Sequence, residues 1–182
     1  MTKTIFASGT KQSIEQVLAD KDQRVNLQKK LFREFPHSVL LDVKLNIPGP
    51  IKNNQYLKQL FLTGIKTLEK SLKKEHLSFK LMKKWDKPTG CENFYLVNDN
   101  SRAVKKTAID FENQSQLTRL FDADVLVENE LAALSLSRTD LDMPARKCFL
   151  CDRPAKDCAR SRRHSVQELQ EYISRIYYQQ VK

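Results

Sequence analysis

Val39-Leu-Leu-Asp-Val-Lys-Leu-Asn-Ile47 is the stretch of this sequence that most strongly constrains the fold. Apolar residues occupy every second position of the stretch, and Asp42, Lys44 and Asn46 lie between them. This period of two is typical of a strand with one face buried and the other face polar. Pro48-Gly-Pro50 follows directly and is expected to end the strand.

Helices are expected on both sides of this strand, and further strands follow it. Ser13-Ile-Glu-Gln16 fits a capping box, and the apolar spacing after it predicts a helix over 13–35. A second capping box, Ser165-Val-Gln-Glu168, is expected to open a last helix that ends near 179. Between them we expect a helix over 53–74, strands over 77–85 and 94–97 joined by a turn at 88–90, a helix over 101–115, a strand over 122–127 and a short strand near 131–136.

The central elements follow the order strand-helix-strand-strand-helix-strand, which is the order of the split βαβ arrangement. The sequence therefore predicts an α+β fold, with a mostly antiparallel sheet, a ferredoxin-like or palm-like core and the spatial strand order 4-1-3-2. An N-terminal helix precedes the core. We expect residues 1–137 to form this core and residues 138–182, a basic Cys/His knuckle plus a helix, to pack on it as one domain. In this topology the loop 46–50, the turn 88–92 and the strand start at 122–124 converge at one end of the sheet.

The composition favours an anionic partner and argues against export. A formal net charge of +10 over 182 residues suits nucleic acid, a phosphorylated ligand, an acidic protein or an anionic membrane. Three of the four cysteines lie within the eleven positions 148–158, unlike a secreted disulfide framework. No window approaches the roughly 18 apolar residues of a membrane span, and the N-terminus lacks the apolar run of a signal peptide. We therefore expect a cytoplasmic protein that does not enter a membrane.

Three short motifs at the predicted convergence point carry groups that suit phosphate chemistry. Asp122 and Asp124 lie two apart on a strand, so both carboxylates face one side and could hold Mg²⁺; a solvated strand end is the alternative. In Asn46-Ile-Pro-Gly-Pro-Ile-Lys52 the glycine permits close backbone approach and the lysine adds a cation, which suits a phosphate, although a simple turn explains the loop equally well. Thr89-Gly-Cys-Glu92 offers hydroxyl, backbone and carboxylate groups, or is a hairpin tip without further role.

The segment from residue 146 to 165 combines metal-binding side chains with positive charge. Cys148, Cys151, Cys158 and His164 have the spacing Cys-x2-Cys-x6-Cys-x5-His, which could surround a tetrahedral Zn²⁺. Four protein ligands would close the coordination sphere, so this zinc would be structural; a free-thiol knuckle held by ordinary packing is the alternative. Five basic residues of the same stretch could meet phosphate or an acidic protein surface, namely Arg153, Lys156, Arg160, Arg162 and Arg163. No Ser-His-Asp arrangement, Walker loop or dinucleotide loop is recognisable.

Four motifs occur in order along the chain: Leu45-Asn-Ile-Pro-Gly-Pro-Ile-Lys52, Thr89-Gly-x-Glu92, Arg119-Leu-Phe-Asp-Ala-Asp-Val125 and Arg146-x-Cys-x2-Cys-Asp-Arg-Pro-Ala-x2-Cys158-x-Arg-Ser-Arg-Arg-His-Ser165. Together they resemble the citrate lyase holo-acyl-carrier-protein synthase family, the apo-citrate lyase phosphoribosyl-dephospho-CoA transferases. The resemblance spans about residues 13–180. It implies a nucleotidyltransferase-type enzyme that attaches the prosthetic group of citrate lyase to a serine of its apo acyl carrier protein. The implied donor is 2′-(5″-triphosphoribosyl)-3′-dephospho-CoA, and diphosphate is released.

The implied reaction needs a metal to neutralise the triphosphate, cations for the leaving diphosphate and a group that orients the serine, and we assign residues of these motifs to each need. Asp122 and Asp124 would hold Mg²⁺, and Glu92 would complete the catalytic set by orienting the serine. The substrate-binding residues would be Asn46, Gly49, Lys52, Thr89, Gly90, Arg119, Arg160, Arg162 and Arg163. A non-catalytic, basic zinc-knuckle protein that binds nucleic acid is the alternative from another class. The net charge favours this alternative, whereas the carboxylate pair and the lack of a regular aromatic stacking platform make nucleic acid the weaker partner.

Overall fold

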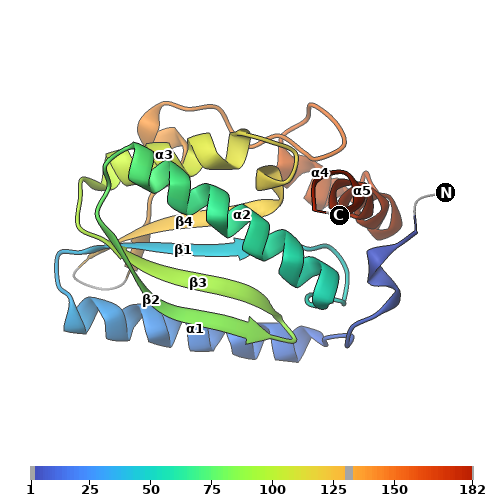
Figure 1. Cartoon of the computed structure of the whole chain (residues 1–182), viewed down its shortest axis with the longest axis horizontal. Helices are drawn as coiled ribbons and strands as arrows, with labels where there is room; N and C mark the ends of the chain where they lie inside the picture. Colours follow the sequence, from blue (N-terminus) through green and yellow to red (C-terminus); the bar gives the residue numbers. More distant parts are fainter. Residues whose placement is uncertain (1–2, 130–132, 182) are drawn as a thin grey trace.

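An antiparallel sheet runs through the middle of the computed structural model, and helices pack on both of its faces (Figure 1). The structure describes residues 3–129 and 133–181. The strands are β1 (Val39–Leu45), β2 (Phe79–Lys87), β3 (Gly90–Val97), β4 (Phe121–Glu128) and β5 (Ala133–Ser135). The helices are α1 (Ile14–Glu34), α2 (Gln55–Lys74), α3 (Ser101–Asn113), α4 (Ala155–Ser161) and α5 (Val166–Gln180), with short 3-10 turns at Ile5–Ala7, Thr118–Leu120 and Thr139–Leu141.

The spatial order of the strands is β2-β3-β1-β4-β5, and every neighbouring pair is antiparallel. The first four strands therefore confirm the predicted order 4-1-3-2, and β5 extends the sheet beyond β4. Residues 131 and 132 of the predicted short strand lie outside the described residues. The register places Lys44 opposite Glu92 on β3 and opposite Asp122 on β4. The end of β1 thus meets the starts of β3 and β4, as the topology predicts.

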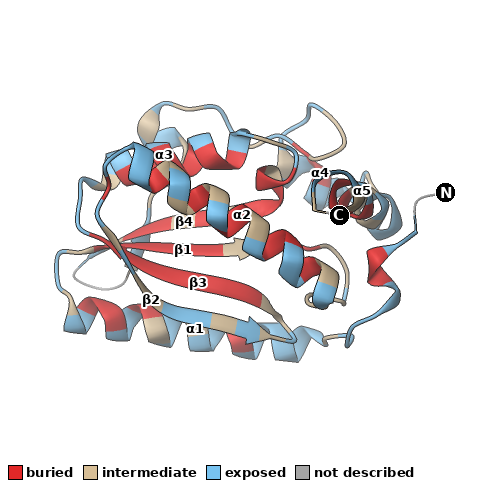
Figure 2. Cartoon of the chain, viewed as in Figure 1, coloured by how far each residue is buried: buried red, intermediate tan, exposed pale blue. Residues whose placement is uncertain are grey.

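Each face of the sheet has its own apolar core. Alternate β1 residues such as Leu41 and Val43 pack with α2 and α3 in the larger cluster. Leu40 and its cross-strand neighbours pack on the opposite face against Leu31 and Phe32 of α1. Figure 2 shows that β1, β3 and β4 are largely buried, whereas the edge strand β2 is mostly exposed or intermediate. The face of the sheet under α1 thus carries the smaller of the two apolar clusters.

Both predicted capping boxes are present. Ser13 accepts a hydrogen bond from the backbone of Gln16 at the start of α1, and Ser165 does the same for Glu168 at the start of α5. The two helices begin one residue after these caps, so their predicted starts are confirmed to within one residue. Capping explains why two largely polar helices begin at defined points.

The start of β3 and the helix α4 differ most from the sequence-based prediction, and β2 lies two residues later than expected. β3 begins at Gly90 rather than at residue 94, because a tight Pro88-Thr89 turn joins it directly to β2. The sequence pattern did not indicate this strand start, because Glu92 and Asn93 are polar although both side chains are buried. The short helix α4 was not predicted; it lies inside the Cys/His segment and carries Cys158.

The C-terminal helix packs on the core. Ile173, Ile176 and Tyr177 of α5 belong to the larger apolar cluster, together with Ile5 near the N-terminus. The backbone N–H of Ile5 donates to the hydroxyl of Ser174 at 3.2 Å, which ties the two ends of the chain together. Across the described residues, no helix is both long and apolar enough to cross a membrane.

Candidate active site and metal centre

Five charged residues lie on one face of the sheet where β1, β3 and β4 meet. They share a face because residues opposite one another in an antiparallel ladder point to the same side. The ladder pairs Asp42 with Asp124, and Lys44 with both Asp122 and Glu92. The predicted same-side arrangement of Asp122 and Asp124 is thus present, and β1 adds two charged residues between β3 and β4.

Lys44 lies between the two predicted metal-binding carboxylates. Its Nζ is 2.7 Å from Asp124 Oδ2 and 3.7 Å from Asp122 Oδ2. Burial lowers the pKa of Lys44, but the charges of Asp124 and the neighbouring aspartates outweigh it and raise that pKa above its ordinary value. The Asp122 and Asp124 side chains keep about 40% of their surface exposed. The pair is therefore accessible, and Lys44 supplies a permanent positive charge beside it.

Asp42 lies next to this pair but is completely buried beneath α1. Gln28 Nε2 donates to Asp42 Oδ2 at 2.8 Å, and Arg24 Nε lies 3.8 Å from the same oxygen. Asp42 Oδ1 has no hydrogen-bond partner among the described residues. Burial, and then the charge of Glu92, raise the pKa of Asp42 well above its usual value. Asp42 is thus a buried acid that favours its neutral form.

Glu92 is held from above by Arg24 of α1. The Arg24 guanidinium donates from Nε to Glu92 Oε1 and from Nη2 to Oε2 at 3.0 Å. This two-point pairing leaves the Glu92 side chain only 3% exposed. Glu92 lies at the predicted convergence point, but its carboxylate faces Arg24 rather than solvent.

The loop after β1 is organised by its contacts with α5. Gly49 has a φ of +83°, and an added Cβ would lie 2.7 Å from Gln170 Nε2, so glycine is required here for both conformation and space. Gln170 Nε2 also donates to the carbonyl of Pro48 at 3.2 Å. Lys52 Nζ donates to the Ile47 carbonyl at 2.6 Å, and burial lowers the pKa of this lysine. The close approach that Gly49 allows is therefore to α5.

The β2–β3 hairpin tip lies beside the same loop. Gly90 has a φ of +137°, and the nearest atom to a Cβ placed there is the backbone carbonyl oxygen of Lys52, at 4.0 Å. The hydroxyl of Thr89 is buried and has no hydrogen-bond partner among the described residues. Thr89 and Gly90 are thus brought close to the Lys52 loop, as the topology predicts.

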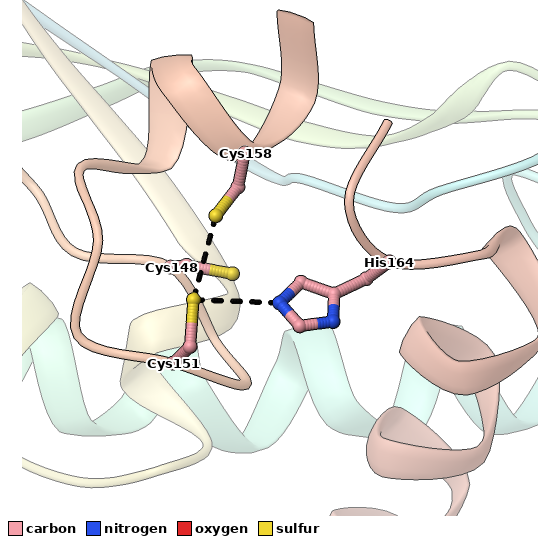
Figure 3. Close-up of side chains that lie close together, drawn as sticks. All are labelled: Cys148, Cys151, Cys158 and His164. Atoms are coloured by element: carbon pink, nitrogen blue, oxygen red, sulfur yellow. Dashed lines mark hydrogen bonds between the residues drawn. The ribbon is translucent and has the colours of Figure 1, made fainter. Parts of the chain in front are cut away.

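Cys148, Cys151, Cys158 and His164 form one compact cluster (Figure 3). Their ligand atoms all lie within 4.8 Å of one another, and Cys151 Sγ is 3.4 Å from both Cys158 Sγ and His164 Nε2. Sulfurs bound to one tetrahedral zinc at about 2.3 Å lie roughly 4 Å apart, so this donor set fits Zn²⁺ in type and spacing. The hydrogen bond with His164 lowers the pKa of Cys151 to about 6, which favours the thiolate that a metal binds. The cluster can therefore bind a metal ion.

Two arginines connect this cluster to the start of β4. Arg119 Nη2 donates to the carbonyls of Lys147 at 3.0 Å and Cys148 at 3.2 Å. Arg146 in turn donates to the Arg119 carbonyl, and its Nη1 lies 3.6 Å from Asp122 Oδ1. Arg119, which we predicted to bind substrate, thus uses its guanidinium on backbone carbonyls, and Arg146 reaches the carboxylate pair.

A pocket of about 440 Å³ lies between the Cys/His segment, α5 and the loop after β1. Asn46 and Arg162 line this pocket together with Arg146. Arg160 and Arg163 are exposed on the same segment but do not line it. The structure thus gathers Asn46, Arg162 and the carboxylate pair at one end of the sheet, and leaves Arg160 and Arg163 on the outer surface.

Sequence reasoning did not assign a site role to Lys44, Asp42, Arg24 or Arg146. Two of them carried a usable signal, because Asp42 and Lys44 repeat the two-residue spacing of Asp122 and Asp124 on the adjacent strand. Arg24 could not be found in this way, since only the packing of α1 over the sheet brings it to Glu92.

Comparison with known proteins identifies relatives over nearly the whole chain. The family model described as "CitX: Apo-citrate lyase phosphoribosyl-dephospho-CoA transferase" matches residues 12–180. A Streptococcus pyogenes serotype M5 (strain Manfredo) protein named "Probable apo-citrate lyase phosphoribosyl-dephospho-CoA transferase" is 35% identical, over 98% of this chain and 92% of its own length. A Citrobacter koseri protein named "Apo-citrate lyase phosphoribosyl-dephospho-CoA transferase" is 32% identical, over 86% of this chain and 84% of its own length. The "Protein CitXG" of Leuconostoc mesenteroides subsp. cremoris is 35% identical over 95% of this chain, which covers 36% of that protein.

Proposed function

The chain belongs to the apo-citrate lyase phosphoribosyl-dephospho-CoA transferase family, and on that premise we propose which molecules it joins. The donor is 2′-(5″-triphosphoribosyl)-3′-dephospho-CoA, and the acceptor is a serine of the apo acyl carrier protein of citrate lyase. The serine oxygen attacks the phosphorus next to the ribose. A Ser O–P bond forms, the bond from that phosphorus to the bridging oxygen of the diphosphate breaks, and the serine proton passes to water. The products are the modified carrier and diphosphate.

The reaction needs positive charge around a triphosphate and a group that receives a proton. The observation that carries the proposal is that Asp122, Asp124, Lys44 and Arg146 lie together at one end of the sheet, beside a pocket lined by further cations. In this proposal Lys44 and Arg146 offset charge on the departing diphosphate. This arrangement suits phosphoryl chemistry better than binding of a nucleic-acid backbone, which the two carboxylates would repel.

We assign Mg²⁺ binding to Asp122 and Asp124. The two carboxylates fit this ion because they project from one strand face, remain partly exposed and offer oxygen ligands. When bound, Mg²⁺ would neutralise phosphate charge and order the triphosphate. The chain's own contribution is to hold both carboxylates at fixed spacing on β4, with Lys44 between them.

Glu92 acts in this proposal as a positioning residue. Its carboxylate is nearly buried and engaged by Arg24, so it supports α1 over the site rather than contacting the serine. The two loops beside the site are shaped by Lys52 and Gly90, which approach backbone carbonyls, and by Gly49, which approaches the Gln170 side chain; Thr89 lies in the turn next to Gly90. Arg160 and Arg163 remain available to the incoming carrier, because both are exposed and form no ion pair among the described residues.

We further propose that Cys148, Cys151, Cys158 and His164 hold one structural Zn²⁺. The residues between them expose polar side chains and contribute little apolar core, so metal ligation would supply the ordering free energy of this segment. All four cysteines of the chain are free thiols, which supports function in the reducing cytoplasm.

The test of the proposed function is the intact mass of the carrier after incubation with this protein, the donor and Mg²⁺. We expect a mass gain equal to the phosphoribosyl-dephospho-CoA group, and no gain on a carrier whose acceptor serine is changed to alanine. Absence of any gain with authentic donor would reject the proposal. Retardation of labelled RNA or DNA at physiological salt, without transfer, would instead support the nucleic-acid-binding alternative.

A further inference from the structure

The pocket beside the Cys/His cluster is lined on one side by Cys148, Cys158, His164 and Ser165, and three chemically different groups of side chains line the rest. Its apolar wall is formed by Pro48, Phe149, Ala155, Ala159, Val166 and Leu169. Its cationic wall is formed by Arg146, Lys147 and Arg162. Asn46 adds an amide that can donate and accept hydrogen bonds. A volume of about 440 Å³ lies within the range of roughly 300–1,000 Å³ that is typical of small-molecule sites.

This combination of walls selects for a ligand that is both aromatic and anionic. Phe149 offers a ring face or edge, and its ring is held by a near-parallel stack on Tyr172 with centroids 6.2 Å apart. Arg162 forms no ion pair with any described residue, so its charge is available. Among the described residues, Lys147 forms an ion pair only with the fully exposed Asp152, at 3.5 Å, and solvent screens this pair. A base can therefore stack in the pocket while phosphates meet its cations.

Arg146 connects the pocket to the carboxylate pair, because it lines the pocket and also lies next to Asp122. It lines the pocket, its guanidinium lies 5.9 Å from the centre of the Phe149 ring, and its Nη1 lies 3.6 Å from Asp122. A nucleoside seated against Phe149 would thus place a phosphate substituent near Arg146 and the Asp122 end of the sheet. In the donor the reactive triphosphoribosyl group is attached to the adenosine. An adenine bound in the pocket would therefore bring the reacting phosphate toward Asp122 and Asp124.

We propose that this pocket binds the adenosine 5′-diphosphate part of the donor, with the adenine against Phe149 and the diphosphate at Arg162 and Lys147. This assignment rests on the proposed function for the identity of the donor. Binding of the nucleotide part to the pocket requires no transfer reaction, so it can be measured separately from the proposed function.

The experiment is calorimetric titration of the full-length protein with 3′-dephospho-CoA, and separately with ADP and with 4′-phosphopantetheine. We expect 3′-dephospho-CoA and ADP to bind and 4′-phosphopantetheine alone to bind at least about tenfold more weakly. Phe149→Leu should weaken nucleotide binding about tenfold, since stacking on a base is worth about 1–3 kcal/mol. Arg162→Asn should weaken it similarly, and asparagine tolerates the left-handed conformation of that position, where φ is +46°.

Lys156→Gln is the matched control, because it removes one positive charge from α4 without touching the pocket. Its nucleotide affinity should equal that of the unmodified protein, and metal content and thermal unfolding should confirm that all three variants are folded. Equal affinity of all variants for 3′-dephospho-CoA, or no binding at millimolar concentration, would overturn the pocket assignment. Transfer to the carrier that persists with unchanged donor KM in Phe149→Leu and Arg162→Asn would overturn the pocket but not the function. Nucleotide binding that depends on these two residues, in a protein that transfers nothing, would retain the pocket and reject the function.

Discussion

The guanidinium of Arg146 lies 3.6 Å from the carboxylate of Asp122 and also donates to the backbone carbonyl of Arg119. This contact joins the Cys/His segment directly to the strand that carries the proposed Mg²⁺ ligands. Because Arg146 is two residues before Cys148, an ordered Cys/His cluster holds the Arg146 cation at the carboxylate pair. The Cys/His segment therefore supports the site as well as its own fold.

Replacing either proposed Mg²⁺ ligand should abolish most of the activity and leave the fold intact. We expect Asp122→Asn and Asp124→Asn each to lower turnover by about 100-fold or more. Asparagine keeps the shape of aspartate but removes the negatively charged oxygen ligand. Both side chains are about 40% exposed, so circular dichroism and thermal unfolding should change little. Asp110→Asn, an exposed acid of α3 that pairs with Lys106, is the control and should retain full turnover. Near-normal rates in both site variants would place the metal elsewhere.

The Cys/His cluster should contain one zinc ion per chain. Elemental analysis of protein purified without chelator should give a ratio near one, and Cys151→Ser should lower that ratio and make residues from about 140 onward sensitive to proteolysis. Cys91→Ala is the matched control, because Cys91 is a buried thiol outside the cluster and its loss should leave the zinc content unchanged. A zinc content near zero would mean that packing and the backbone hydrogen bonds from Arg119 hold this segment.

The buried acid Asp42 should make stability fall as the pH rises. Its pKa is raised in the folded protein, so between the unfolded and folded pKa values the folded state retains a proton that the unfolded state has lost. The free energy of unfolding should decrease by up to about 1.4 kcal/mol for each pH unit in that interval. Asp42→Asn keeps the shape and can still accept from Gln28, so it should be more stable than the unmodified protein at pH 8 and differ least near pH 4. The free energy of unfolding is measured in urea for both proteins from pH 4 to 8. A difference between the two proteins that stays the same at every pH would contradict a raised pKa for Asp42.

Gly64 of α2 should tolerate no side chain. A Cβ at this position would lie 2.1 Å from the ring of Phe121, the first residue of β4, and this ring is itself fully buried. We expect Gly64→Ala to lower the free energy of unfolding by about 1–3 kcal/mol, because β4 or α2 must shift. Since Asp122 follows Phe121, turnover should fall as well. Lys66→Ala on the exposed face of the same helix is the control, and equal unfolding midpoints for both variants would show that the contact relaxes freely.

Local sequence patterns were sufficient to predict the strand order. The alternation in 39–47, the two capping boxes and the element order together yield the sheet that the structure contains. The start of β3 was missed because Glu92 and Asn93 are polar yet buried, and a period of two in apolar residues cannot detect such positions. α4 was missed because a helix of seven residues with Cys158 as its buried residue has no apolar periodicity of its own.

The site was predictable in its location but not in its internal pairing. The convergence of Asp122, Asp124 and the loop after β1 follows from topology alone, and the Cys/His spacing predicted a cluster that the structure brings together. The contacts of Arg24 with Glu92 and of Arg146 with Asp122 join residues 68 and 24 positions apart, and they depend on how α1 and the Cys/His segment pack. No local pattern encodes such contacts, so pairing partners required the tertiary structure.

The most direct test of the proposed transfer is to measure carrier modification and diphosphate release in the same reaction. Intact-protein mass spectrometry would count modified carrier, and an enzymatic diphosphate assay would count the leaving group. Attack by a carrier serine on the phosphorus next to ribose predicts one diphosphate for each modified carrier, with both signals lost together in Asp124→Asn. Diphosphate release without carrier modification, or carrier modification without diphosphate, would contradict the proposed reaction.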